Sequence, residues 1–290
     1  MHLISNEYMD IFDNQSDLTA HLHRIATTGT TLGFVPTMGA LHQGHLSLLE
    51  KSNKNNTFSV ISIFVNPTQF NNAEDLAKYP RTLEKDIEKI RTVSDKILIF
   101  APSVKDIYDG KTVSQQFDFD GLENMMEGRF RPGHFNGVGT IVKRLFEIVK
   151  PSNAYFGEKD FQQLQIVRKM VEKHNIPVNI IGCPIFREAN GLAMSSRNER
   201  LNTAERSEAA VIYKTLRSVK TKFTNESAKQ ITEWVSSVFQ NTPGFELEYF
   251  EIADEATLQP TDYRAIDRKY RAFIAVFVNK IRLIDTISLN

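Results

Sequence analysis

The sequence predicts an α/β fold in which a doubly wound parallel sheet is followed by a smaller α+β domain. Three observations support this prediction. Short, almost continuously apolar runs recur through the first two thirds of the chain, amphipathic helical patterns separate several of them, and after residue 195 two helical stretches precede two strand-like runs. Apolar runs of this kind are typical of strands buried on both faces, and their alternation with helices is typical of a parallel sheet.

The length of the chain indicates two domains. With 290 residues it exceeds the ~100–200 residues of one ordinary domain. The change of pattern places the boundary between residues 185 and 186, so that the larger domain spans residues 1–185 and the smaller one 186–290.

The individual elements follow from the periodicity of apolar residues. Ser16 is the expected N-cap of a first helix that carries Leu18, Leu22 and Ile25 on one face, and Thr82 is the expected N-cap of a later helix. Strands are expected at residues 32–35, 60–65, 97–100, 154–156 and 178–181, further helices around 141–148, 164–171, 204–223 and 228–239, and C-terminal strands at 245–252 and 272–278.

Composition excludes several classes of protein. Lys and Arg total 35 against 35 Asp and Glu, so the chain lacks the basic excess typical of a nucleic-acid binder. We find no run of ~18 apolar residues that would suggest a membrane span, and no basic start with an apolar block that would suggest a secretory signal. We therefore expect a cytoplasmic protein. Cys183 is the only cysteine, which rules out an internal disulfide, and we expect it to be a small core residue.

The strongest local signal lies where the first long strand ends. Residues 36–45 read Pro-Thr-Met-Gly-Ala-Leu-His-Gln-Gly-His, so a turn with glycine leads into a helix that begins beside His42 and His45. Ligands of α/β sheets bind at this edge, where a helix N-terminus offers free N–H groups to phosphate. Two exposed histidines that merely cap the helix are the alternative. The strand–turn–helix setting, with Gly44 allowing close backbone approach, favours a phosphate site.

Two further loops carry side chains suited to a nucleotide. Residues 157–160, Gly-Glu-Lys-Asp, follow a predicted strand; Lys159 could contact phosphate oxygens and Asp160 could accept hydrogen bonds from ribose hydroxyls. Residues 194–197, Met-Ser-Ser-Arg, offer two hydroxyls and a guanidinium near the domain boundary. An ordinary polar turn and a helix cap with a surface arginine would explain each loop by itself. Three such loops in one chain favour a nucleotide site.

Longer motifs give the chain a family resemblance. It contains neither a Walker A lysine loop nor a Gly-x-Gly-x-x-Gly run. The His-Gln-Gly-His run at a helix start, with the later small-polar-basic loop, is similar to the nucleotidyltransferase superfamily that includes class I aminoacyl-tRNA synthetases. The runs at residues 64–70 (Phe-Val-Asn-Pro-Thr-Gln-Phe), 79–81 (Tyr-Pro-Arg), 131–135 (Arg-Pro-Gly-His-Phe) and 187–198 more closely resemble the pantothenate synthetase (pantoate–β-alanine ligase) family. This resemblance extends from about residue 31 to residue 201.

The resemblance implies a two-step reaction. Pantoate would attack the α-phosphorus of Mg²⁺-ATP to form pantoyl adenylate, and β-alanine would then displace AMP. His45, His42 and Lys159 would be the catalytic residues, Gln69 and Gln163 would bind the small substrates, and Asp86 would contact Mg²⁺. ATP would be bound by Met38, Gly39, Ala40, Leu41, His42, Gln43, Gly44, His45, Gly157, Glu158, Lys159, Asp160, the backbone at Phe186, and Met194, Ser195, Ser196 and Arg197.

The resemblance also has consequences for architecture. It implies a Rossmann-like domain over residues 1–185 that binds ATP and pantoate, a C-terminal domain over residues 186–290 that closes over the active site, and a homodimer. Phe186 stands where the family more often has valine, and Asn190 where it usually has aspartate. Two alternatives remain: an adenylyl- or cytidylyltransferase with another acceptor, and a nucleotide-sensing or RNA-binding protein without catalysis. The neutral amides of Gln69 and Gln163 suit a small hydroxy acid better than a phosphorylated acceptor, which argues against the first alternative. The balanced charge of the chain argues against RNA binding.

Overall fold

A computed structural model describes residues 9–70 and 73–290 of the chain. Its contacts divide the chain into two compact units. The first comprises the residues up to Phe119 together with Arg131–Gly157 and Ile166–Cys183, and the second comprises Asp120–Phe130, Glu158–Gln165 and Pro184–Asn290. Two short segments, Asp120–Phe130 and Glu158–Gln165, therefore belong to the second unit although residues of the first unit follow each of them in the sequence.

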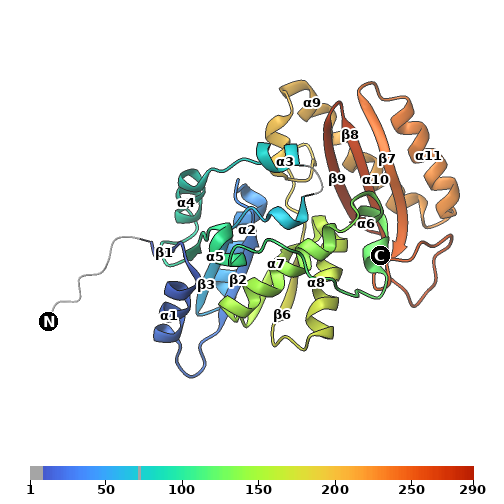
Figure 1. Ribbon diagram of the computed structural model, residues 1–290. Helices are drawn as coiled ribbons and strands as arrows, with labels where there is room; N and C mark the ends of the chain where they lie inside the picture. Colours follow the sequence, from blue (N-terminus) through green and yellow to red (C-terminus); the bar gives the residue numbers. More distant parts are fainter. Residues whose placement is uncertain (1–8, 71–72) are drawn as a thin grey trace. The chain divides into compact units, whose positions relative to one another are not determined.

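The first unit is built on a six-stranded sheet in the order β1-β4-β3-β2-β5-β6, and every neighbouring pair is parallel. Figure 1 labels β1, β2, β3 and β6 of this sheet. The predicted α/β class with a parallel sheet is therefore confirmed. The strands are Ile11–Phe12 (β1), Leu32–Thr37 (β2), Phe58–Ile63 (β3), Leu98–Phe100 (β4), Asn153–Gly157 (β5) and Asn179–Cys183 (β6).

Helices cover both faces of this sheet. Successive strand residues point to opposite sides, so the apolar residues of each strand pack against helices on both faces. On one face Phe34 of β2 meets Phe146 of helix α7 (His134–Val149) edge to face, with ring centroids 6.2 Å apart. On the other face Val35 belongs to an apolar cluster that includes Leu49 of helix α2 (Gln43–Asn55) and the buried Cys183. The helices of this part of the chain are Gln15–Ile25 (α1), Gln43–Asn55 (α2), Ala73–Lys78 (α3), Leu83–Arg91 (α4), Val104–Tyr108 (α5), His134–Val149 (α7) and Phe161–Lys173 (α8), with a 3-10 turn at Pro67–Gln69 (η1).

Two details of the first unit differ from the sequence prediction. The N-cap of α1 is Asn14 rather than Ser16, because the side-chain oxygen of Asn14 accepts the N–H of Asp17 at 2.9 Å and the helix begins at Gln15. Strand β1 was not predicted; with two residues it is too short to give a periodic signal. Thr82 is the N-cap of α4, as predicted.

The second unit contains an antiparallel three-stranded sheet in the order β7-β8-β9. Its strands are Phe245–Asp254 (β7), Tyr270–Val278 (β8) and Ile281–Ser288 (β9), and its helices are Met126–Phe130 (α6), Thr203–Glu208 (α9), Ala210–Lys222 (α10) and Ala228–Gln240 (α11), with 3-10 turns at Leu122–Asn124 (η2), Glu158–Asp160 (η3) and Ser196–Arg200 (η4). Apolar residues of α10, α11 and all three strands form one core. The predicted α+β character of the C-terminal region is confirmed, although β9 was not predicted.

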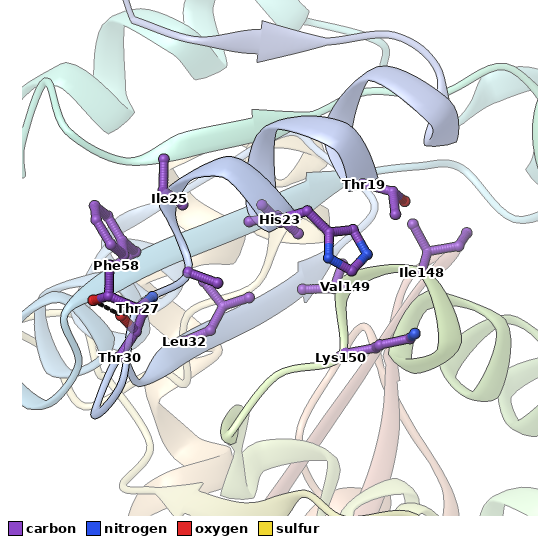
Figure 2. A pocket seen from close by; sticks show the side chains of 12 residues that line it. Thr19, His23, Ile25, Thr27, Thr30, Leu32, Phe58, Ile148, Val149 and Lys150 are labelled. Atoms are coloured by element: carbon purple, nitrogen blue, oxygen red, sulfur yellow. Dashed lines mark hydrogen bonds between the residues drawn. The ribbon is translucent and has the colours of Figure 1, made fainter.

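A cavity of about 200 Å³ lies at the amino-terminal edge of the parallel sheet. Leu32 and Phe58, the first residues of β2 and β3, line it together with the C-terminal ends of α1 and α7 (Figure 2). Thr27 and Thr30 at its wall are joined by a hydrogen bond of 2.9 Å between their hydroxyls. No candidate site residue lines this cavity. Within the described part of the chain, no helix has the length and apolar character needed to cross a membrane.

Candidate active site

The strand order defines where a ligand should bind to the parallel sheet. The chain proceeds from the central strand β2 to β3 and β4 on one side, and later returns to β5 and β6 on the other. β2 and β5 are thus neighbours whose following loops leave the same carboxyl edge in opposite directions. Ligands of open α/β sheets bind at such a switch point. The loop after β2, which carries the two predicted histidines, begins there.

Asp86 holds the loop after β2. Its carboxylate is fully buried, and it accepts the backbone N–H groups of Ala40 at 3.0 Å and Leu41 at 2.7 Å. Gly39 and Ala40 both have positive φ, at +82° and +50°. A side chain on Gly39 would begin 3.0 Å from Ile63 and 3.1 Å from Asp86, which explains the glycine. The amides of Ala40 and Leu41, two predicted ATP-binding residues, are therefore already bonded to protein.

His42 and His45 lie together at the start of α2. His42 is the N-cap of the helix, and the two imidazole rings stack with centroids 4.0 Å apart. The backbone N–H of His42 donates to Nδ1 of His45 at 3.3 Å. Nδ1 is thereby an acceptor, so neutral His45 carries its proton on Nε2. His42 is thus the cap residue that the alternative proposed, but both rings are half-buried rather than exposed, and the neutral His45 ring carries its N–H on Nε2.

Gln69 lies beside the same loop. Its side-chain amide donates to the sulfur of Met38 at 3.1 Å and accepts from Asn66 at 3.2 Å, so two predicted site residues are in contact. Backbone packing fixes this turn: a Cβ on Gly137 of α7 would fall 2.3 Å from the carbonyl oxygen of Thr68. The ring of His134 contacts the carbonyl oxygen of Gln69 at 2.9 Å. The neutral amide of Gln69 is thus held at the carboxyl edge of the sheet.

In the second unit, η3 carries the predicted residues Glu158, Lys159 and Asp160. The ammonium of Lys159 lies 3.2 Å from the carboxylate of Asp160, and the Lys159 side chain is 18% exposed. Glu158 is paired instead with the buried Arg271, at 3.2 Å. Lys159 is therefore the cation of this turn and is paired with its neighbour Asp160, whereas Glu158 has a structural partner.

A hairpin spanning residues 186–194 leads into η4. Arg187 and Ala193 form an antiparallel bridge, and the N–H of Met194 donates to the carbonyl of Phe186 at 3.0 Å. The side chain of Phe186 is exposed. Ser195 is the N-cap of η4, and its hydroxyl accepts the N–H of Arg197 at 3.3 Å. The cap predicted as an alternative for Ser195 is present, and the hydroxyls and the guanidinium stand on one short turn.

Side-chain hydrogen bonds support this hairpin from behind. Glu188 accepts from Arg206 at 2.8 and 3.0 Å and from Asn198 at 2.7 Å, and Asn198 also donates to the carbonyl of Ala193. The Glu188 carboxylate raises the pKa of Arg206, which keeps that guanidinium charged. Asn190 accepts from Leu192 N–H at 3.1 Å and donates to the carbonyl of Arg206 at 3.0 Å. An aspartate at this position could not make the second bond.

Sequence reasoning included Glu188, Asn190 and Asn198 in the run at residues 187–198 but gave them no supporting role, and it did not single out Arg206. It assigned Gln163 to substrate binding and gave no role to its neighbour Gln162. The Gln162 side chain is buried, accepts the N–H of Glu127 and donates to the carbonyls of Leu122 and Met125. Gln163 is half-buried on the same helix, α8. Among residues 9–70 and 73–290, no group of three or more His, Cys, Asp or Glu is arranged to hold a metal ion.

Histidines at a helix start on the switch point of a parallel sheet are an arrangement typical of α/β proteins that bind phosphate-containing ligands. Comparison with known proteins gives the family. A family model described as pantoate-beta-alanine ligase matches residues 10–288. The chain belongs to the pantoate–β-alanine ligase family.

Individual relatives agree with this assignment. The chain is similar to a pantothenate synthetase of Flavobacterium psychrophilum, with 62% identity over 97% of this chain and 100% of that protein. A pantothenate synthetase of Christiangramia forsetii is 52% identical over the same shares. Among solved structures, pantothenate synthetase from Thermus thermophilus has a TM-score of 0.88 at 37% identity, covering 97% of this chain and 99% of that one. The ligase from Francisella tularensis, solved with beta-gamma ATP and β-alanine, has a TM-score of 0.80 at 36% identity, covering 97% and 98%.

Proposed function

We propose that this protein condenses (R)-pantoate with β-alanine at the expense of ATP, giving pantothenate, AMP and pyrophosphate through a pantoyl-adenylate intermediate. The observation that carries the proposal is the position of His45 at a helix start on the carboxyl edge of the parallel sheet, where its Nδ1 accepts a backbone N–H and the proton of the neutral ring is therefore on Nε2. Family membership over residues 10–288, and relatives named for this activity, support the same reaction.

In the first step a carboxylate oxygen of pantoate attacks the α-phosphorus of ATP, and the bond from that phosphorus to the bridging oxygen of the β-phosphate breaks. Negative charge shifts onto the phosphoryl oxygens and the leaving pyrophosphate, so the useful contribution of the protein is to place donors and cations. We assign the donor role to His45, with His42 and Lys159 as further contacts. Ser195, Ser196 and Arg197 would bind pyrophosphate, and Gln69 and Gln163 would bind pantoate.

In the second step the free amine of β-alanine attacks the acyl carbon of pantoyl adenylate. The bond from that carbon to the phosphate oxygen of AMP breaks, AMP leaves, and the nitrogen loses a proton as the amide forms. The neighbouring residues need to hold the adenylate away from water until the amine arrives, since hydrolysis would waste the ATP.

Asp86 does not fit the predicted role of a Mg²⁺ contact. Its oxygens accept two backbone N–H groups and the hydroxyl of Thr82, and the side chain is fully buried. Mg²⁺ usually binds through few carboxylates, several waters and the phosphates of the substrate. We therefore treat Mg²⁺ as part of the substrate Mg²⁺-ATP, and we assign Asp86 the positioning of the loop after β2.

The family resemblance also supports a cytoplasmic homodimer as part of the proposal. Light scattering coupled to size-exclusion chromatography would give twice the 33.1 kDa mass of one chain for a dimer. Elution at the mass of one chain across the micromolar range would contradict it.

Isotope exchange between ATP and pyrophosphate tests the proposed function. Exchange should require pantoate but not β-alanine, because the amine enters only after adenylation. Sustained release of AMP should require both pantoate and β-alanine. Exchange that depends on β-alanine would exclude the two-step reaction, and the absence of AMP from the complete mixture would favour the nucleotide-sensing alternative.

A further inference from the structure

A buried carboxylate interrupts an apolar face of the last strand. Asp285 lies on the same side of β9 as Ile281 and Leu283, since residues two apart in a strand share a face. Those two residues belong to the core of the second unit, and the Asp285 side chain is only 3% exposed. A buried charge is costly unless it is paired, and a polar residue that breaks an apolar pattern often marks a functional region.

Arg187 provides the partner. Its guanidinium donates to both oxygens of Asp285, at 2.6 and 2.9 Å, and to the carbonyl of Gly191 at 3.1 Å. The guanidinium also lies over the ring of Tyr213 in α10, and the distance from its Cζ atom to the ring centroid is 3.6 Å. A carboxylate, a carbonyl and an aromatic face therefore fix both the position and the plane of one guanidinium, which a lysine could not reproduce.

This guanidinium also holds the hairpin that leads to Ser195. Arg187 forms the bridge with Ala193, two residues before Ser195. Gly191 in the hairpin turn has φ of +95°, and a Cβ there would fall 2.7 Å from the Tyr213 ring. The turn, the guanidinium and the aromatic ring are thus packed together, and a shift of Arg187 would move the segment that leads from Ala193 to Ser195.

The second neighbour of Asp285 is the turn that carries Lys159. η3 packs against β9. Burial raises the pKa of Asp285, while the charges of Arg187 and, more weakly, Lys159 oppose that rise. Both η3 and η4 pack against β9, the strand that carries Asp285, so both segments of this unit to which ATP binding has been assigned meet the same strand.

We propose that Asp285 and Arg187 are a positioning pair that holds the Ser195–Arg197 turn in register with Lys159, so that both segments can bind the phosphates of one nucleotide. The inference rests on the proposed function in that it takes these residues as ATP ligands. Neither Asp285 nor Arg187 needs to touch the nucleotide.

The experiment measures ATP affinity directly, by calorimetry with a non-hydrolysable ATP analogue, beside the steady-state constants. Asp285→Asn keeps the shape and removes the charge, and Arg187→Lys keeps the charge and removes the fork. We expect each to raise the Kd and the KM for ATP by about tenfold or more, since small misplacements of binding groups can cost up to ~10²-fold. The KM for β-alanine should change less than about twofold, and the double variant should be no worse than the poorer single variant, because both break one interaction.

Two matched controls separate positioning from general stability. Arg282→Lys alters another ion pair of β9, in which Arg282 donates to Glu127 and Glu248. It should lower the melting temperature and leave the Kd for ATP unchanged. Tyr213→Phe keeps the aromatic face and should bind ATP like the wild type, whereas Tyr213→Leu should raise the Kd about threefold, the scale of one cation–π contact.

Folded Asp285→Asn and Arg187→Lys proteins with wild-type Kd would overturn the inference, as would an equal rise of Kd in Arg282→Lys. If Asp285→Asn does not fold, the Tyr213 variants decide: equal ATP affinity in Tyr213→Leu and Tyr213→Phe overturns it. The test also distinguishes the two proposals. A wild-type protein that binds the ATP analogue but shows no pantoate-dependent exchange would contradict the proposed function, while the Kd comparison would still test the positioning pair.

Discussion

The loop after β2 and the hairpin before η4 both carry residues proposed to bind ATP, but different interactions fix them. One buried carboxylate, Asp86, holds the first loop by accepting its backbone N–H groups. Side-chain pairs hold the second, and one of them, Glu188 with Arg206, leaves the arginine 36% exposed. Backbone bonds to a buried charge resist solvent and fix a chain closely, whereas a half-exposed ion pair contributes less. The buried pair of Arg187 and Asp285 holds one side of the hairpin, so the comparison indicates that only the side supported by Glu188 and Arg206 is more adjustable than the loop after β2.

The largest effect should follow from removing the donor on the rigid loop. His45→Ala should lower kcat by ~10²-fold or more, because a preorganised donor to developing charge is typically worth that much. Its melting temperature should stay near that of the wild type. His45→Gln, whose amide can still donate, should recover part of the loss. Turnover close to wild type in His45→Ala would leave the histidine with its capping role alone.

Asp86→Asn tests how the rigid loop is held. Asparagine offers one acceptor oxygen where the carboxylate offers two, so one buried N–H of Ala40 or Leu41 loses its partner. We expect a loss of about 1–3 kcal/mol in the free energy of unfolding, measured in urea. Glu147→Gln, which breaks a half-exposed pair with Lys143, is the control and should change the stability little. Equal stabilities of the two variants would refute the role given to Asp86.

Sequence reasoning predicted the parts of the molecule that local pattern determines. Strands β2 and β3 are long apolar runs, and the His42–His45 helix start lies directly after one of them. It missed β9, where Arg282, Asp285 and Thr286 interrupt the apolar pattern. Asp86 was found, but its role was not. Its partners lie 45 and 46 residues earlier in the chain, and only the fold brings them together.

Glu188→Gln should have a smaller effect, confined to the adjustable hairpin. The glutamine side chain retains one acceptor oxygen for Arg206 or Asn198, but it lacks the negative charge that forms the ion pair with Arg206. We expect a rise of roughly threefold in the KM for ATP with little change in kcat, since a positioning contact is weakened and no reacting group is lost. A fall in kcat with unchanged KM would indicate that the hairpin acts on the chemical step, and the contrast between the two loops would fail.

Asn190→Asp should have the smallest effect. It removes the donor to the carbonyl of Arg206, while the acceptor for Leu192 N–H remains. We expect a loss of about 0.5–1.5 kcal/mol at most, the usual net value of one hydrogen bond. The urea midpoint of the variant measures this loss. A rise in that midpoint would show that the donor bond contributes nothing to holding the hairpin.

The division of the chain between its two units has a consequence for synthesis. Segment Asp120–Phe130 belongs to the second unit, and its buried Glu127 is bonded to Tyr249 and Arg282, residues made more than a hundred positions later. Domains generally fold N-terminal first as they leave the ribosome. This segment cannot fold in that order, because a nascent chain that ends before β9 would bury the Glu127 carboxylate without its partner Arg282. The segment between residues 120 and 130 should therefore acquire its native contacts only after β9 emerges. The second unit should complete its folding only once its last strand has been synthesised.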